Sequence, residues 1–215
     1  MVASATVGVS WGFTNRREFL GRMVNRADER AFDVYLYLLK EYNGNRDAEV
    51  TVNHEKLAES LGIKREAREA YRREILRVLR KLKSIYGLID AATGRGGDSR
   101  VILKDYAHPK RSYRPSGGKF LNLSVNYWKY GWNRRLKFSA KVMYLLNLAY
   151  AAVSPRAPEW FSTVATLSKR HGLSGWFISD GTTALRRAAQ VIRLKNPDNP
   201  KRSMNYLMGT AENLK

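Results

Sequence analysis

The chain has 215 residues, of which 44% are hydrophobic and 11% aromatic, a composition that indicates globular domains and excludes a disordered basic tail. It carries 39 Lys and Arg against 19 Asp and Glu, and residues 106–215 alone hold 19 against 4. This imbalance favours a polyanionic partner, and nucleic acid rather than an acidic membrane, because no basic amphipathic helix with large aromatic anchors is evident. The absence of cysteine excludes disulfide frameworks and thiolate metal sites.

Residues 1–10 show no basic stretch followed by a long apolar one, and no run of 18 apolar residues occurs in the sequence. We therefore expect no signal peptide and no membrane span. Together with the missing cysteines, this predicts a cytoplasmic, nucleoid-associated protein.

A segment of about 50 residues, 31–82, recurs position by position 110 residues further on. The matched pairs include Leu57 with Leu167, Gly62 with Gly172, and Ile75 with Leu185. Each copy is expected to form a helix, a short strand, two helices around a Gly turn, and a β hairpin. The sequence thus predicts a mainly α fold with small β hairpins (α+β), as two winged helix-turn-helix domains at 1–105 and 120–215, joined by a basic linker at 106–119.

In the first copy, Asp28 is expected to cap a core helix that ends near Tyr42, and residues 49–52 are a strand-like run. Asn53 is expected to cap a helix over 54–61, and Gly62 to supply a turn of positive φ. Apolar residues then recur in steps of three and four over 64–84, which predicts one helix about 30 Å long.

The opposite face of that helix is basic near its start, where recognition helices present base-reading side chains. An Arg fork there can bond guanine O6 and N7 together. The alternative is a solvated face in which Glu69 pairs with Arg73. The candidate DNA contacts are Lys64, Arg65, Arg68, Glu69, Arg72 and Arg73.

Two strand-like runs, 87–92 and 100–105, flank a Gly-rich tip and predict a hairpin, or wing. Arg95 and Arg100 on it are candidates for minor-groove or phosphate contacts, the alternative being an ordinary mobile hairpin. The linker alternates basic and aromatic residues, so it either follows a phosphate backbone through Lys110, Arg111 and Arg114 or only spans a gap.

The second copy opens with alternation over 120–125 and an aromatic cluster that includes Trp128 and Trp132, which we expect to serve packing rather than base stacking. Ser139 is expected to cap a helix reaching Val153, and residues 163–171 to form the next helix. The third helix is expected to begin only near Ser179 or Thr182, because Gly residues precede it. Phosphate contact is expected here more than base reading. The candidates are Lys169, Arg170, Thr182, Thr183, Arg186 and Arg187, with Lys201 and Arg202 on a second hairpin.

Catalytic motifs are lacking. The three histidines, His54, His108 and His171, are far apart and fit no zinc spacing, and residues 116–119 lack the spacing of a phosphate loop. We expect no enzymatic activity, no metal, no cofactor and no small-molecule ligand.

The two Gly-turn segments, 57–63 and 167–173, and the doubled architecture resemble tandem winged-helix proteins, and among them the replication initiators of plasmids and other mobile elements. The resemblance implies sequence-specific binding to double-stranded DNA at repeated origin sites, with one winged helix in the major groove and the other in a neighbouring groove or at a homodimer contact. Three alternatives stay open. They are a transcriptional regulator acting at an operator, a winged-helix scaffold for protein partners, and an RNA-binding basic protein.

Overall fold

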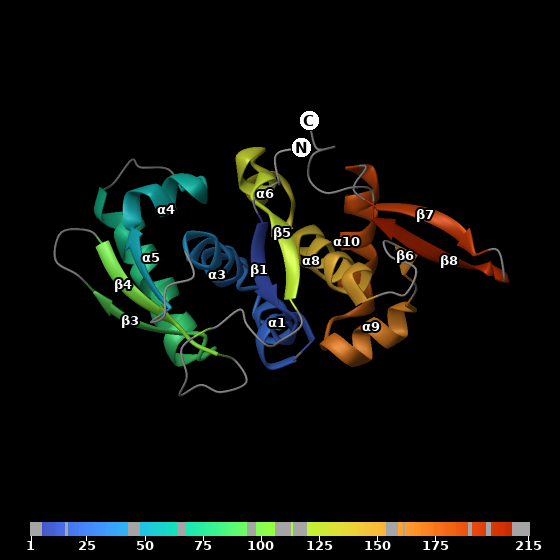
Figure 1. Cartoon of the computed structure of the whole chain (residues 1–215), viewed down its shortest axis with the longest axis horizontal. Coiled ribbons are helices and arrows are strands. Elements are labelled where there is room, and N and C mark those ends of the chain that lie inside the picture. The colour runs from blue at the N-terminus through green and yellow to red at the C-terminus, as the bar shows by residue number, and fades with distance from the viewer. Residues whose placement is uncertain are drawn as a thin grey trace. The chain divides into compact units, whose positions relative to one another are not determined.

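The computed structural model describes residues 6–15, 17–42, 48–63, 68–93, 98–105, 113, 120–153, 159–160, 162–188, 191–196 and 199–207. Within these ranges, the side chains of residues 68–69, 92–93, 159 and 191–207 lie outside the description. The fold is mostly helical with small antiparallel sheets, an α+β architecture as expected (Figure 1). The chain divides into two compact units, which we call the middle unit (Arg26–Lys119) and the split unit (Met1–Asn25 with Phe120–Lys215).

The division differs from the expected one, which placed residues 1–25 in the first domain. Strand β1 (Thr6–Ser10) pairs antiparallel with β5 (Phe120–Ser124), with Thr6 opposite Ser124. Val9 and Leu121, which lie opposite each other in this register, are fully buried. The main-chain edge of β1 is therefore paired with residues that follow the linker, and no local sequence signal reports such a pairing.

In its described residues, the middle unit has a helix, a strand, two further helices and a hairpin. Its elements are α3 (Glu29–Glu41), β2 (Glu49–Asn53), α4 (His54–Ser60), α5 (Arg68–Ser84), β3 (Ile89–Thr93) and β4 (Asp98–Leu103). The three strands form one antiparallel sheet in the order β2-β4-β3.

The split unit begins with four short elements, β1, α1 (Trp11–Asn15), the π-helix η1 (Arg17–Gly21) and α2 (Arg22–Asn25). It continues with β5, α6 (Asn126–Lys129), α7 (Trp132–Arg135), α8 (Phe138–Val153), β6 (Glu159–Trp160), α9 (Val164–His171), α10 (Gly175–Arg187), β7 (Val191–Asn196) and β8 (Asn199–Leu207). Its second sheet has the order β6-β8-β7. From α8 onward, the split unit thus repeats the element order and the strand order that the middle unit has from α3 onward.

Several local predictions for the middle unit are confirmed. Asn53 caps α4, since its side chain accepts a hydrogen bond of 2.9 Å from the Lys56 amide. Gly62 has φ of +65° and Gly172, at the equivalent place in the split unit, has +68°, a conformation that a residue without Cβ adopts at little cost. Both copies therefore turn between their second and third helices through a left-handed glycine.

Asp28 stands at the N-cap of α3, as expected, but its side chain does not cap the helix. Its buried carboxylate instead accepts hydrogen bonds from Lys81 Nζ and from the Tyr86 hydroxyl, each 3.0 Å long. A buried carboxylate needs such partners because burial without them is costly. Asp28 therefore ties the start of α3 to the end of α5.

The third helix of the split unit begins earlier than expected. Helix α10 starts at Gly175, and the Ser174 hydroxyl caps it by accepting a 3.1 Å hydrogen bond from the Phe177 amide. Gly181 lies against α8, where a Cβ would overlap the Ser139 carbonyl oxygen and come within 2.7 Å of Met143 Cγ. The glycine that weakens helix propensity is thus the residue that lets two helices approach closely.

Ser139 does not cap α8, because the helix already begins at Phe138. Its hydroxyl donates to Asp180 Oδ2 at 2.6 Å, and Lys137 pairs with the same carboxylate. This polar contact joins the start of α8 to α10.

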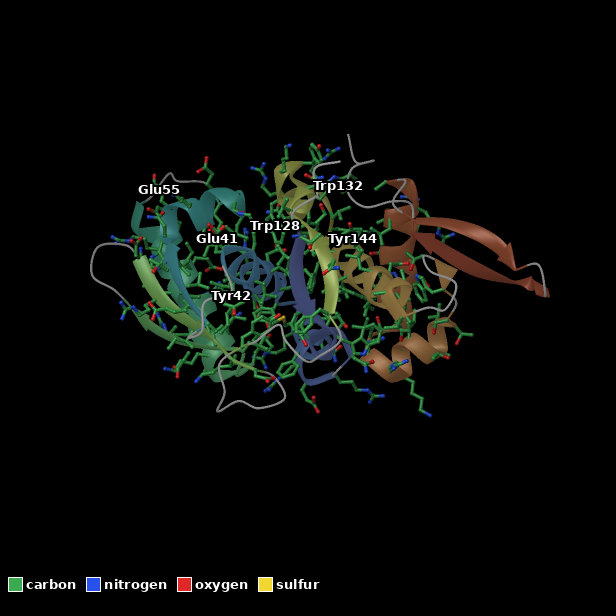
Figure 2. All side chains as sticks on the ribbon, viewed as in Figure 1. Glu41, Tyr42, Glu55, Trp128, Trp132 and Tyr144 are labelled. Carbon is green, nitrogen blue, oxygen red and sulfur yellow. The ribbon has the colours of Figure 1, made fainter. Side chains whose placement is uncertain are left out.

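The aromatic cluster of the split unit is part of its core. Tyr127 and Tyr144 stack with ring centroids 6.0 Å apart, and Trp128 meets Tyr127 edge-on at 5.2 Å. Trp132 and Tyr144 are buried, and Figure 2 labels them with Trp128. These rings support packing, as expected, and do not form an exposed stacking surface.

We predict that Gly181→Ala lowers the free energy of unfolding of the split unit by about 1 to 3 kcal/mol, because the added methyl group overlaps α8 backbone. The matched control is Gly175→Ala, whose Cβ would meet only Val164 Cγ1 at 3.4 Å and should change stability by less than about 1 kcal/mol. Urea unfolding followed by tryptophan fluorescence measures this unit alone, because all tryptophans of the chain lie in it: Trp11, Trp128, Trp132, Trp160 and Trp176. Equal midpoints for the two variants would show that α10 does not approach α8 closely at Gly181.

Candidate nucleic-acid interface

Helix α5 of the middle unit has one apolar face and one basic face. The apolar face is buried and consists of Tyr71, Ile75, Val78, Leu79 and Leu82. The steps of three and four between these residues fix which side chains point outward. Arg73, Arg77 and Arg80 are exposed, and Arg72 is half-buried.

Part of this positive charge is compensated within the unit. Arg77 pairs with Glu74 at 2.6 Å, and Lys83 pairs with Asp90 at 2.6 Å. Lys81 pairs with Asp28, whereas Arg72, Arg73 and Arg80 make no ion pair with any side chain that the structure describes. The uncompensated charge on the described part of α5 is therefore concentrated at these three arginines, of which Arg73 and Arg80 are exposed.

The other candidate DNA contacts of this unit lie partly or wholly outside the described residues. Arg68 and Glu69 lie in the first turn of α5, but their side chains are outside the described residues. Lys64 and Arg65 are outside them altogether, as are Arg95 at the hairpin tip and Lys110, Arg111 and Arg114 in the linker. Tyr113 is described and buried, and its amide donates a hydrogen bond to the Leu103 carbonyl at 2.9 Å. At this residue the expected linker is packed on the middle unit.

The hairpin next to α5 carries Arg100 on β4. Its side chain is largely exposed (69%), but Nε lies 2.9 Å from Glu49 Oε1 on the neighbouring strand β2. Contact with a phosphate group would have to compete with this carboxylate. Arg100 is thus available at the surface, with part of its charge compensated.

The hairpin of β3 and β4 is also held in place by helix α4. Buried His54, the first residue of α4, lies with Nε2 2.8 Å from Ser99 Oγ on β4. Burial, and then the positive charge of Arg72, lower the pKa of His54. A neutral ring in this position links the start of α4 to the sheet.

An open groove of about 430 Å³ lies between α5 and the hairpin. The groove is lined by three apolar residues, Leu76, Leu79 and Ala91, by Ser99, and by two cationic residues, Arg80 and Lys83. Arg80 therefore lies both on the basic face of α5 and at this groove.

In the split unit, His171 holds helix α9 in place. Its Nδ1–H donates to the Thr14 carbonyl at 2.7 Å, so in the neutral ring Nε2 accepts from the Tyr150 hydroxyl at 2.9 Å. Burial lowers the pKa of His171 below its usual value. The ring thus connects the end of α9 to α1 and to α8.

Lys169 and Arg170 both lie exposed near the end of α9. Arg170 Nε donates to Asn15 Oδ1 at 2.8 Å, and its guanidinium lies 5.8 Å from the Tyr150 ring centroid. The Lys169 carbonyl accepts a hydrogen bond from Arg17. Arg170 therefore has a structural role in addition to its charge.

The outer face of α10 differs from the expected one. Thr182 was a candidate for DNA contact, but it is only 9% exposed and its hydroxyl donates to the Ile178 carbonyl at 2.7 Å. Because the helix starts at Gly175, its exposed face runs through Trp176, Ser179, Thr183, Arg186 and Arg187. Lys201 and Arg202 lie on β8, and their side chains are outside the described residues.

Sequence reasoning missed Trp176 as a surface residue. It is 74% exposed, the highest value among the large hydrophobic side chains that the structure describes. The N-cap serine at 174 was the available signal, since it sets the helix start and with it the outward face. The two glycines at 175 and 181 obscured that signal.

The charge of the split unit is strongly one-sided. Residues 1–25 and 120–215 hold 18 Lys and Arg against 5 Asp and Glu, whereas residues 26–119 hold 21 against 14. One of the five carboxylates, that of Asp180, binds Lys137 and Ser139, and these contacts lower its pKa. Few carboxylates are therefore left in this unit to repel a polyanion.

Among the described residues, no group of three or more His, Cys, Asp or Glu is arranged to hold a metal ion. Within the same part of the chain, no helix combines the length and the apolar character that crossing a bilayer requires. No protein-family model matches the chain, and comparison with curated proteins finds no relative.

We predict that the split unit loses stability as the pH falls from 7.5 to 5.5. The unfolded chain has a His171 of ordinary pKa, near 6.5, and the folded unit has a lower one, so below about pH 6.5 the unfolded state takes up the proton first. His171 is the only histidine in this unit. Stability is thus greatest above pH 6.5 and is lost as the pH falls toward the folded pKa.

The measurement is the urea midpoint of tryptophan fluorescence at both pH values, for the wild type and for His171→Gln. The variant should be less stable at pH 7.5, because the contacts with Thr14 and Tyr150 are altered, yet it should show a smaller decline on acidification. A decline of the same size in both proteins would assign the proton uptake to another group.

Proposed function

We propose that the chain is a double-stranded DNA-binding protein without enzymatic activity, built from two winged helices, that acts at a replication origin or operator of a mobile element. The observation that carries this proposal is the repeated arrangement of elements. In each unit a left-handed glycine turn leads into a third helix with arginines on its exposed face, and an antiparallel hairpin follows that helix.

This arrangement fits duplex DNA for geometrical reasons. The major groove, about 12 Å wide, admits one α-helix, and a helix that follows a tight turn projects its first residues toward base edges. A hairpin beside the helix lies near the sugar-phosphate backbone, where it positions the protein without reading the sequence. The strand orders β2-β4-β3 and β6-β8-β7 place such a hairpin directly after α5 and α10.

The two units differ in the role that we assign to them. In the middle unit we assign base reading to the first turns of α5, where Arg68 and Arg72 lie, and phosphate contact to Arg73 and Arg80. In the split unit, Arg186 and Arg187 are exposed in the last turn of α10, and we assign them to phosphates. This unit holds 18 cationic residues against 5 anionic ones. That imbalance supports a large sequence-independent contribution to its affinity for DNA.

A direct test is selection from a random duplex pool, followed by competition with single-stranded DNA and with RNA. Enrichment of one duplex motif, with weak competition by the other nucleic acids, is the expected result. If RNA competes as well as the duplex, the chain is better explained as an RNA-binding protein. If the protein neither retains duplex DNA nor enriches any motif, it is better explained as a scaffold for protein partners. Whether the enriched motif lies at an origin or at an operator follows from its position in the parent element.

We predict that Arg68→Ala weakens binding to the selected duplex by about 1 to 3 kcal/mol and relaxes base choice at one position, because a bidentate contact to guanine is lost. The control is Lys40→Ala, which removes one positive charge from α3 of the same unit, outside the candidate reading helix. Fluorescence anisotropy with the selected duplex and single-base variants provides the measurement. If Arg68→Ala discriminates among the variants as the wild type does, α5 is not the reading helix.

We predict that binding to any duplex falls steeply with salt, by roughly 10³ to 10⁵ fold between 50 and 200 mM for about 6 to 10 phosphate contacts. Replacing both Arg186 and Arg187 by Ala should reduce the slope of log affinity against log salt by about 2, equally for all sequences. The matched control replaces both Lys129 and Arg134 by Ala, which also removes two exposed cations from the split unit and should change the slope less. A slope near zero for the wild type would remove the electrostatic basis of the proposal.

A further inference from the structure

Trp176 is an exposed indole in a position that packing does not explain. Its exposed fraction is 74%, whereas Trp132 and Trp160 are buried and Trp11 and Trp128 are half-buried. Leaving so large an apolar side chain in water forgoes the stabilisation that burial would provide. A partner that covers the ring would account for its placement.

The backbone that carries Trp176 is held firmly. The Ser174 cap fixes the first turn of α10, and Phe177 meets Phe138 of α8 edge-on with ring centroids 5.8 Å apart. On the inner face Ile178 is buried, and Gly181 lies against the α8 backbone. Trp176, the second residue of the helix, is therefore presented outward by a rigid support.

The surface around the indole changes in character along the helix. Val164, the first residue of α9, is 43% exposed and lies beside Gly175, so a small apolar surface marks the start of α10. Ser179 and Thr183 follow at steps of three and four on the same face, and Arg186 and Arg187 complete it. The face thus passes from apolar, through hydroxyl groups, to guanidinium groups over a helix of 13 residues.

We propose that Trp176 is the base-contacting residue of the split unit and that its indole packs against the 5-methyl group of thymine in the major groove. The proposal rests on the proposed function and assigns base reading to a unit for which the sequence favours phosphate contact over base reading. The first residues of a helix in the major groove lie closest to the base edges, and the thymine methyl is the apolar group exposed there. The arginines at the far end of the same face then reach phosphates.

The size and charge of the surface favour DNA over a second protein. A stable protein interface covers about 800 Å² on each partner, whereas one aromatic side chain covers roughly 150 to 250 Å². Among the described residues, the exposed large hydrophobic side chains are Trp176, Val164 and Val153, too few for such an interface. The cationic excess of the split unit matches a polyanion.

The test uses the full-length protein and the duplex selected from the random pool, in which each thymine in turn is replaced by uracil. This replacement removes only the 5-methyl group. For the wild type, uracil at one or two positions should weaken binding about fourfold, the ratio that corresponds to burial of one methyl group. Trp176→Ala should bind more weakly and show no uracil effect at those positions, whereas Trp176→Phe should retain part of it.

Val153→Ala serves as the matched control, because Val153 is another exposed apolar residue of the split unit, 41% exposed, at the end of α8. It should bind as the wild type does. Addition of the duplex should also protect one tryptophan from acrylamide quenching in the wild type and protect none in Trp176→Phe. Urea midpoints of the variants show that the exposed substitution leaves the fold intact.

The outcomes separate this inference from the proposed function. Salt-dependent binding of the wild type with the same uracil profile in Trp176→Ala would overturn the inference and leave the function standing. A change in sedimentation of Trp176→Ala without a change in DNA affinity would assign the indole to a contact between copies of the chain and would also overturn it. Failure of the wild type to bind duplex DNA would overturn both.

Discussion

The close approach of α10 to α8 determines what the split unit presents to solvent. Gly181 brings the two helices together, and Asp180 beside it binds Lys137 and Ser139 at the start of α8. With the helix held in this rotation, Ile178, Thr182 and Leu185 face inward. The outward positions are then fixed by helical geometry, and among them are Trp176 at one end and the arginines at the other. A rotation of α10 by one residue would bury different side chains and leave another face for a ligand.

The same sequence of elements in the two units carries unlike distributions of charge. In the middle unit, cations of α5 are placed next to carboxylates, as in the pairs of Arg77 with Glu74 and Lys83 with Asp90. Paired surface charges contribute little stability, but they reduce the net field of the helix. The split unit has few carboxylates, so its field is nearly unopposed. Under the proposed function, the split unit would therefore supply the larger share of sequence-independent attraction to a polyanion.

The sequence predicted those features whose cause is local. Asn53 caps α4 because of its own side chain, and Gly62 and Gly172 turn the chain because they lack a Cβ. The start of α10 was predicted too late, because Gly175 and Gly181 lower helix propensity while close packing on α8 overrides it. That error placed Thr182 outside and left Trp176 unnoticed. The pairing of β1 with β5 joins residues more than a hundred positions apart, and no pattern in either strand specifies its partner.

The β1–β5 pairing also means that the middle unit is inserted into the split unit rather than following it. During synthesis, β1 has no strand partner until the ribosome has passed residue 124, so the inserted unit is complete before its host. A fragment that stops at the linker would leave the main-chain donors and acceptors of β1 open, with buried Val7 and Val9 brought to the surface. Dividing the chain into an N-terminal and a C-terminal half would therefore disrupt the core of the split unit. Removing residues 26–119 as one piece would keep the residues of each hydrophobic core together.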